Sequence, residues 1–117
     1  MSDANHGEEL AEVTNGIVRL FSEYYGRGPT RAKSYLLDDA YLVTVLRDTL
    51  TTVERTLAET GHGDQVRSVR LTFQEAMADT FKAVVEQALH RPVVAYHSQL
   101  LIDADMGFEL FVLDEVD

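Results

Sequence analysis

Two arginines stand among glycines in the segment Gly26–Arg31, the part of the sequence whose residue types best suit ligand binding. Glycines such as Gly28 leave backbone N–H groups accessible, and the guanidinium groups of Arg27 and Arg31 carry charge that a small anion would pair with. The segment lacks the G-x-x-x-x-G-K-S/T spacing of a phosphate-binding loop, and a strand follows it, so no helix N-terminus would face the anion. The alternative interpretation is a helix stop and turn whose arginines pair with carboxylates.

A second pair of arginines, Arg67 and Arg70, lies in a segment with helical spacing, on the same side as Gln74. One interpretation makes them cations at the edge of the core, with their aliphatic stems packed on apolar surface. The other joins them to the Gly26–Arg31 turn as a set of anion-binding residues. The sequence therefore offers, as one hypothesis, a sensor for a small anion or a nucleotide.

Metal binding and covalent catalysis have little support in the sequence. There is no cysteine, and none of the four histidines has a partner at i, i+4 spacing. No serine stands in a G-x-S-x-G motif. The turn Asp103–Gly107 with Glu109 has carboxylates at alternate positions, but it lacks the remaining ligands of a calcium-binding EF-hand loop. We therefore predict no catalytic residue, no metal site and no cofactor, and we favour a non-enzymatic role over an enzymatic one.

Length, composition and charge favour one cytoplasmic domain. The chain has 117 residues, of which 45% are hydrophobic, and its 20 acidic against 10 basic side chains give a net charge of -10. That charge repels nucleic acid and anionic lipid surfaces. No wholly apolar stretch approaches the roughly 20 residues that cross a bilayer, so we expect no membrane insertion. We expect residues 1–7 to form a flexible acidic leader and residues 8–117 to form a single domain.

Hydrophobic spacing predicts the elements that must position these residues. Apolar residues recur at helical spacing from Glu8 to the glycine at position 26, and two alternating runs, 32–37 and 41–46, then predict a hairpin. Thr51 and Glu54 form a capping box for a short helix.

The second half of the chain begins with a long helical pattern from Asp64 to His90, and the strand runs 93–102 and 108–113 follow it. The predicted order is α-β-β-α-α-β-β. We therefore expect an α+β fold with a four-stranded antiparallel sheet, made of two hairpins, packed with three helices. Leu20, Phe73 and Phe81 occupy the centres of the helical stripes and are expected in the core.

Several predicted strands carry large apolar residues on both faces, as Val43 and Val45 oppose Leu42 and Leu46. A sheet packed on one side alternates more regularly between apolar and polar residues. Either helices cover both faces, or the second face meets another subunit, and a homodimer is the commonest way to cover such a surface.

The order of these features resembles the MpsC-like family of small bacterial proteins, from about Leu10 to Leu113. The G-R-G-P turn followed by L-T-x-x-E is the most specific feature. The residues that carry the resemblance are Gly26-Arg27-Gly28-Pro29, Tyr35-Leu36-Leu37 with Val43, Leu50-Thr51 with Glu54 and Leu57, Arg67 and Arg70 with Phe73, and Phe111-Val112-Leu113.

The resemblance implies a link to a sodium-translocating, membrane-potential-generating system that is itself associated with bicarbonate uptake. It carries no catalytic residue onto this chain. Our first hypothesis is accordingly a non-enzymatic, soluble accessory or interaction protein, homodimeric, with a soluble or membrane protein as partner. The alternative is the anion or nucleotide sensor that uses the Gly26–Arg31 turn.

Overall fold

The computed structural model of the chain describes residues 6–115. The predicted leader overlaps this part only at its end, because the first helix begins at Gly7; residues 1–5, like 116–117, lie outside the described residues. The elements in chain order are α1 (Gly7–Tyr25), β1 (Arg31–Leu37), β2 (Tyr41–Arg47), α2 (Thr52–Glu59), α3 (Gly63–Ala76), α4 (Ala78–Leu89), β3 (Val93–Leu101) and β4 (Met106–Leu113).

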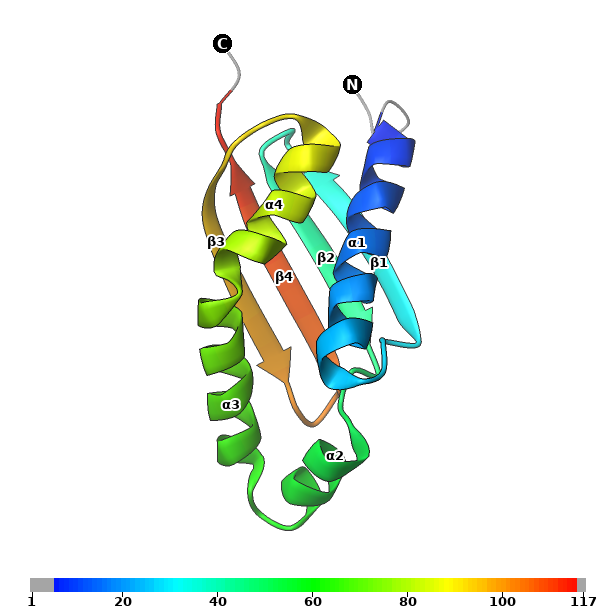
Figure 1. Cartoon of the computed structure of the whole chain (residues 1–117), viewed down its shortest axis with the longest axis vertical. Coiled ribbons are helices and arrows are strands. Elements are labelled where there is room, and N and C mark those ends of the chain that lie inside the picture. The colour runs from blue at the N-terminus through cyan, green and yellow to red at the C-terminus, as the bar shows by residue number, and fades with distance from the viewer. Residues whose placement is uncertain (1–5, 116–117) are drawn as a thin grey trace.

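The four strands form one antiparallel sheet in the order β1-β2-β4-β3 (Figure 1). Each outer strand is joined to its inner neighbour by a tight turn, and Asp38 and Asp39 in the first turn adopt the left-handed conformation that such turns require. The inner strands β2 and β4 come from different halves of the sequence, and they pair from Tyr41 with Val112 to Arg47 with Met106. The predicted α+β fold with a four-stranded antiparallel sheet is confirmed.

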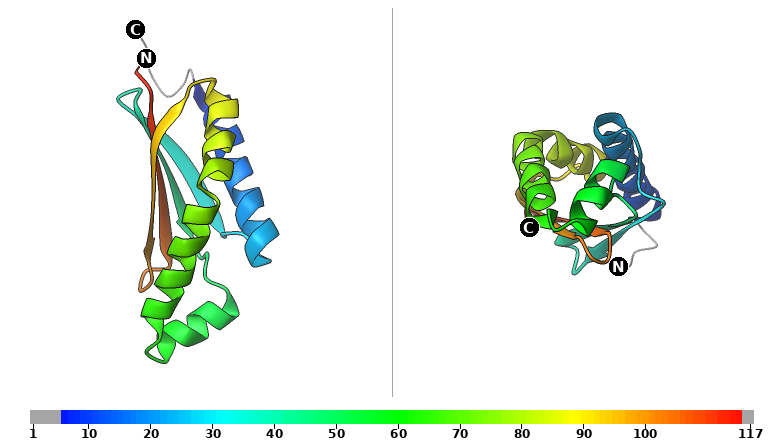
Figure 2. Two further views of the ribbon diagram at one scale, coloured as in Figure 1. Left: turned by 60° about the vertical axis from the view of Figure 1, so that its left-hand side comes forward. Right: turned by 90° about the horizontal axis from the view of Figure 1, so that it is seen from below.

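Helices α1, α3 and α4 lie on the same face of the sheet (Figure 2). Helix α1 packs along β1, α3 and α4 lie over β3, and α2 lies at the end of the sheet beside α3 (Figure 1). The core fills the space between the helices and the sheet, where Ile17, Phe81 and Phe111 have no exposed surface. Phe73 and Leu20 pack against this core and are partly buried. None of the helices in residues 6–115 lies on the opposite face of the sheet (Figure 2).

The predicted long helix from Asp64 to His90 is two helices, so the structure has four helices where the sequence indicated three. The break lies at Met77, whose φ of -104° and ψ of 9° depart from helical values. A straight helix over that range would extend about 40 Å and would leave the twisted sheet. The bend at Met77 instead directs α4 toward α1 (Figure 2).

Helices α1 and α4 pack closely at Gly16. A Cβ atom at this position would lie 2.6 Å from Cγ1 of Val84, a stiff β-branched side chain. We therefore expect Gly16→Ala to lower the free energy of unfolding by roughly 1–2 kcal/mol in urea denaturation, although alanine alone favours a helix by about 1 kcal/mol. Adding Val84→Ala should make the cost of Gly16→Ala smaller. A stabilising effect of Gly16→Ala would contradict the close contact.

Candidate functional site

Arg70, predicted as an anion ligand, is the centre of a buried ion pair. Its side chain is only 3% exposed, and its Nε donates to Oε2 of Glu54 at 2.7 Å while a terminal nitrogen donates to Oε1 of the same carboxylate. That terminal nitrogen also donates to the Thr49 carbonyl at 3.0 Å. The guanidinium carbon lies 3.8 Å from the ring centre of Tyr25. The positive charge of Arg70 is thus matched within the fold.

Glu54 combines this ion pair with the predicted capping box of α2, which is confirmed. The Thr51 hydroxyl accepts from the Glu54 backbone N–H at 3.1 Å, and the Glu54 carboxylate accepts from the Thr51 N–H at 2.9 Å. Burial alone would raise the pKa of Glu54, but the hydrogen bonds from Arg70 and Thr51 outweigh it and hold that pKa below its ordinary value. One carboxylate therefore fixes both the start of α2 and its position against α3.

The loop between β2 and α2 is held from three sides. Arg27 donates to the Leu50 carbonyl, and the Asp105 carboxylate accepts from the backbone N–H groups of Thr49 at 2.9 Å and Leu50 at 3.1 Å. The sequence-predicted residues Arg27 and Arg70 thus donate to neighbouring carbonyls of one loop. Gly28 allows a close approach to α1, because a Cβ there would lie 2.5 Å from the Ser22 hydroxyl.

The remaining candidate anion ligands lie apart from this loop. Arg31 begins β1, at the far edge of the sheet from α3. Arg67 pairs with Asp64 at 2.7 Å, and together with Arg70 it lines a hollow of about 210 Å³ between α3 and β3. The five predicted anion-binding residues therefore do not meet in one site: Arg27 and Arg70 bind the loop between β2 and α2, Gly28 packs against α1, Arg31 begins β1, and Arg67 lines the hollow beside α3. Anion binding stays a prediction.

Glu109, which the sequence offered only as a possible member of a calcium-binding turn, is a buried carboxyl group. Its side chain faces the helices from β4 and is 1% exposed. The hydroxyl groups of Tyr96 and Ser98 donate to its two oxygens from the neighbouring strand β3. Burial raises the pKa of Glu109 to about 7, against the lowering effect of these hydrogen bonds and of the Arg70 charge. The carboxyl group can therefore gain or lose a proton near neutral pH.

Glu109 belongs to a polar row that crosses the helix-facing side of the sheet. The strand register aligns Ser34, Thr44, Glu109 and Ser98. The Ser34 hydroxyl lies 2.7 Å from that of Thr44 and 2.6 Å from that of Thr14 on α1. Each strand has one serine, threonine or glutamate among its helix-facing residues, but the row exists only once the four strands are in register.

The opposite side of the sheet, which we call the open face, is apolar at its centre. Leu37 and Tyr41, cross-strand partners, are 53% and 44% exposed. The remaining apolar residues of the open face are Tyr35, Val43, Val45, Ala95, Leu101, Met106, Phe108, Leu110 and Val112, and Arg31, Lys33, Arg47, His97 and Gln99 border them. An apolar centre with a polar border is the composition of a protein interface.

Two further observations concern metal ions and membranes. Among residues 6–115, no three histidine, cysteine or carboxylate side chains are placed to hold a metal ion. Within the same range, none of the helices has both the length and the apolar character needed to cross a bilayer.

A family model matches this chain over residues 5–115, and its description is Na+-translocating membrane potential-generating system (MpsC). The matched range includes every helix and strand described above. No curated protein and no solved structure matches the chain.

Proposed function

The chain belongs to the MpsC family, and from this premise we propose that it is a homodimeric, non-enzymatic accessory protein of a membrane-potential-generating system. It acts in the cytoplasm as an interaction protein. The open face of one copy packs against the open face of a second copy.

The observation that carries this proposal is the composition and exposure of the open face. Its centre consists of valine, leucine and phenylalanine side chains on β2 and β4, and no described element covers it (Figure 2). Exposed apolar area of this kind favours association, because burial removes it from water. Two sheets stack face to face at a spacing of about 10 Å, which such side chains fill.

The charges at the two ends of the open face favour a second copy over an unrelated partner. Arg31 and Arg47 are cross-strand partners at one end, and the exposed Asp38 lies in the turn at the other end, beside Asp39, whose carboxylate pairs with Arg91 at 3.4 Å. A twofold axis that lies across the strands reverses their direction in the second copy. It therefore places Arg31 and Arg47 of each copy against Asp38 of the other, so the charges at the two ends of the face complement each other.

The test compares two leucines of nearly equal exposure by analytical ultracentrifugation. Leu37 on the open face is 53% exposed and Leu71 on α3 is 52% exposed, so both accept lysine with little cost to folding. We expect wild type to sediment as a dimer and Leu37→Lys to self-associate at least about tenfold more weakly, since the new charge meets Arg31 and Arg47 of the second copy. Leu71→Lys should leave the dimer intact.

The substitution Leu37→Glu tests the orientation of the two copies. In the arrangement across the twofold axis, glutamate meets the basic end and should weaken the dimer less than lysine does. A wild-type chain that stays monomeric at millimolar concentration, or equal weakening by Leu37→Lys and Leu71→Lys, would exclude the open face as the dimer interface.

A further inference from the structure

Strand β1 is an outer strand of the sheet, because its single neighbour is β2. Alternate backbone N–H and C=O groups of an outer strand point away from the sheet and are free to pair with a further strand. Extended peptides use such edges, where main-chain hydrogen bonds supply affinity and alternate side chains supply specificity. The β1 edge has seven residues, enough to pair with a peptide of about six.

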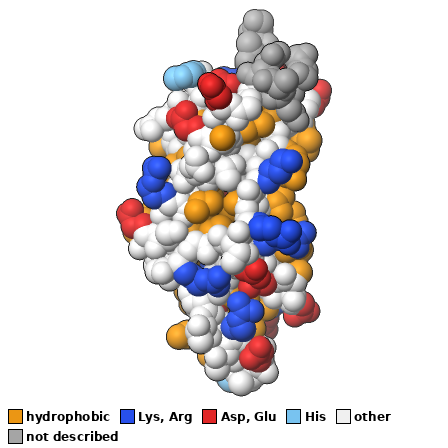
Figure 3. All heavy atoms as spheres, turned by 90° about the vertical axis from the view of Figure 1, so that its right-hand side faces the viewer, with side chains coloured by type: hydrophobic (Ala, Val, Ile, Leu, Met, Phe, Trp, Pro, Cys, Tyr) orange, Lys and Arg blue, Asp and Glu red, His pale blue; other side chains and the backbone are white. Residues whose placement is uncertain are grey.

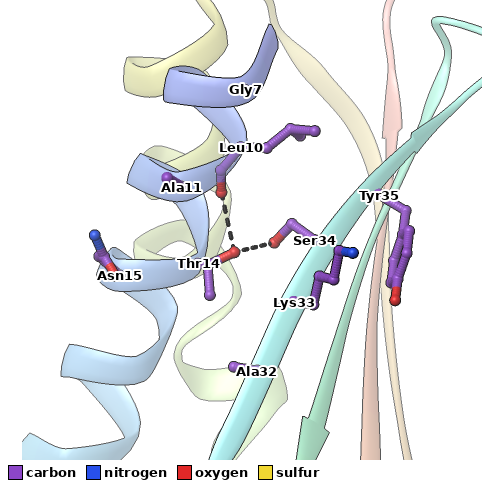
Figure 4. A pocket seen from close by; sticks show the side chains of 9 residues that line it. All are labelled: Gly7, Leu10, Ala11, Thr14, Asn15, Ala32, Lys33, Ser34 and Tyr35. Carbon is purple, nitrogen blue, oxygen red and sulfur yellow. Dashed lines mark hydrogen bonds between the residues drawn. The ribbon is translucent and has the colours of Figure 1, made fainter. Parts of the chain in front are cut away.

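Two hollows meet at this edge, one on each face of the sheet. The first, about 460 Å³, lies between α1 and β1 and has small residues such as Ala11 and Ala32 in its walls (Figure 4). Thr14 and Ser34 close its floor through their 2.6 Å hydrogen bond. The second, about 520 Å³, lies on the open face beside Arg31 and Arg47. Both are lined by Ala32, Lys33 and Tyr35, so they adjoin each other at the edge.

The charge of these hollows is opposite to that of the whole chain. The chain has 20 acidic against 10 basic side chains, yet none of the residues that line the two hollows is acidic, and Arg31, Lys33 and Arg47 are among them. Figure 3 looks onto this side of the molecule, where lysine and arginine side chains lie around exposed hydrophobic surface, with acidic side chains among them. The edge is therefore suited to an extended segment that carries negative charge.

We propose that the β1 edge binds an acidic peptide segment of a partner protein as a fifth strand of the sheet. Side chains of the added strand alternate between the two faces. Those on the open-face side lie beside Arg31 and Lys33 and are acidic. Those on the helix side enter the hollow between α1 and β1 and are small or apolar. The recognised segment thus alternates acidic and apolar residues.

A second copy of β1 fits this edge less well than an acidic segment does. It would bring another Arg31 and another Lys33 to the same edge, where like charges oppose pairing, and charged edge residues are a common protection against self-association. The proposed strand addition also leaves the apolar centre of the open face uncovered. It shares Arg31 with the proposed homodimer, but the two proposals are tested separately, because sedimentation follows the dimer and peptide binding follows the β1 edge.

The test uses the full chain and a fluorescein-labelled six-residue peptide that alternates glutamate and valine. We expect saturable binding by fluorescence anisotropy, with amide chemical shifts changing along β1. The same peptide with N-methyl groups on its central residues should lose most of its affinity, because it cannot donate main-chain hydrogen bonds. Ala11→Phe, which fills the hollow beside α1 from an exposed helix position, should weaken binding as well.

Charge reversal supplies the specificity control. Lys33→Glu should weaken binding of the glutamate-valine peptide about tenfold or more and should strengthen binding of a lysine-valine peptide. Arg67→Glu makes the same charge change on α3 and should have little effect. The proposal is overturned by absence of binding at millimolar peptide, by equal binding of the N-methylated peptide, or by a single-stranded oligonucleotide that competes as well as the acidic peptide.

Discussion

Arg70→Ala is expected to lower the free energy of unfolding by about 3–5 kcal/mol, because it leaves a largely buried carboxylate without its partner. The Arg70 side chain is 3% exposed and that of Glu54 is 12% exposed. The substitution also removes the hydrogen bond to the Thr49 carbonyl and the packing on the Tyr25 ring. Urea denaturation followed by circular dichroism at neutral pH measures the loss, since the chain contains no tryptophan.

Three further variants test whether the loss of stability comes from breaking the buried ion pair rather than from removing any arginine of α3. Arg67→Ala removes an exposed ion pair with Asp64 one turn earlier on α3, so it should change stability by about 0–1 kcal/mol. Arg70→Lys should recover only part of the loss, because an ammonium group cannot replace the two-pronged guanidinium contact. Adding Glu54→Gln to Arg70→Ala should cost less than the separate effects summed. Equal losses for Arg67→Ala and Arg70→Ala would exclude the buried pair as the cause.

The features that the sequence predicts correctly are those determined within a few residues of the chain. The capping box of Thr51 and Glu54 needs only one helical turn, and the hairpin strands follow from alternation and tight turns. The apolar open face was also indicated by the sequence, because several predicted strands carry large apolar residues on both of their faces. The family resemblance read from these ordered features agrees with the matched family model.

The features that escaped sequence analysis depend on contacts between distant segments. Met77 is no helix breaker, and α3 and α4 separate there because α4 turns toward α1. Arg70 is buried because Glu54 on another helix meets it, which the spacing along α3 alone does not show. Glu109 became a buried carboxyl group only through the register that places it beside Tyr96 and Ser98.

The same carboxyl group gives the chain an expected dependence of stability on pH. The pKa of Glu109 is raised from an ordinary value of 4.5 to about 7 in the fold, because burial disfavours the charged form. Between these pH values the folded chain keeps a proton that the unfolded chain has released. The contribution of the protonated Glu109 to the free energy of unfolding is therefore fully present below pH 4.5. It is lost as the pH rises to 7, and the loss amounts to about 3 kcal/mol.

Glu109→Gln should remove this dependence. The amide resembles the protonated carboxyl group, and it can accept from the Tyr96 hydroxyl and donate to that of Ser98. We expect urea midpoints of wild type to fall from pH 5 to pH 8 more steeply than those of the variant. At pH 8 the variant should be more stable by up to about 3 kcal/mol, and at pH 5 the two should differ by about 1 kcal/mol or less.

Glu75→Gln is the matched control, because it removes the same charge at an exposed position on α3. The chain has a net charge of -10, so loss of any carboxylate relieves some general repulsion. Relief of general repulsion should raise stability only slightly in both variants. Only Glu109→Gln also removes the cost of burying a charged carboxylate. Parallel pH profiles for wild type and Glu109→Gln would show that the carboxyl group does not hold its proton in the fold. A steeper loss of stability with rising pH in wild type than in Glu109→Gln would show that the carboxyl group of Glu109 makes folding depend on pH near neutrality.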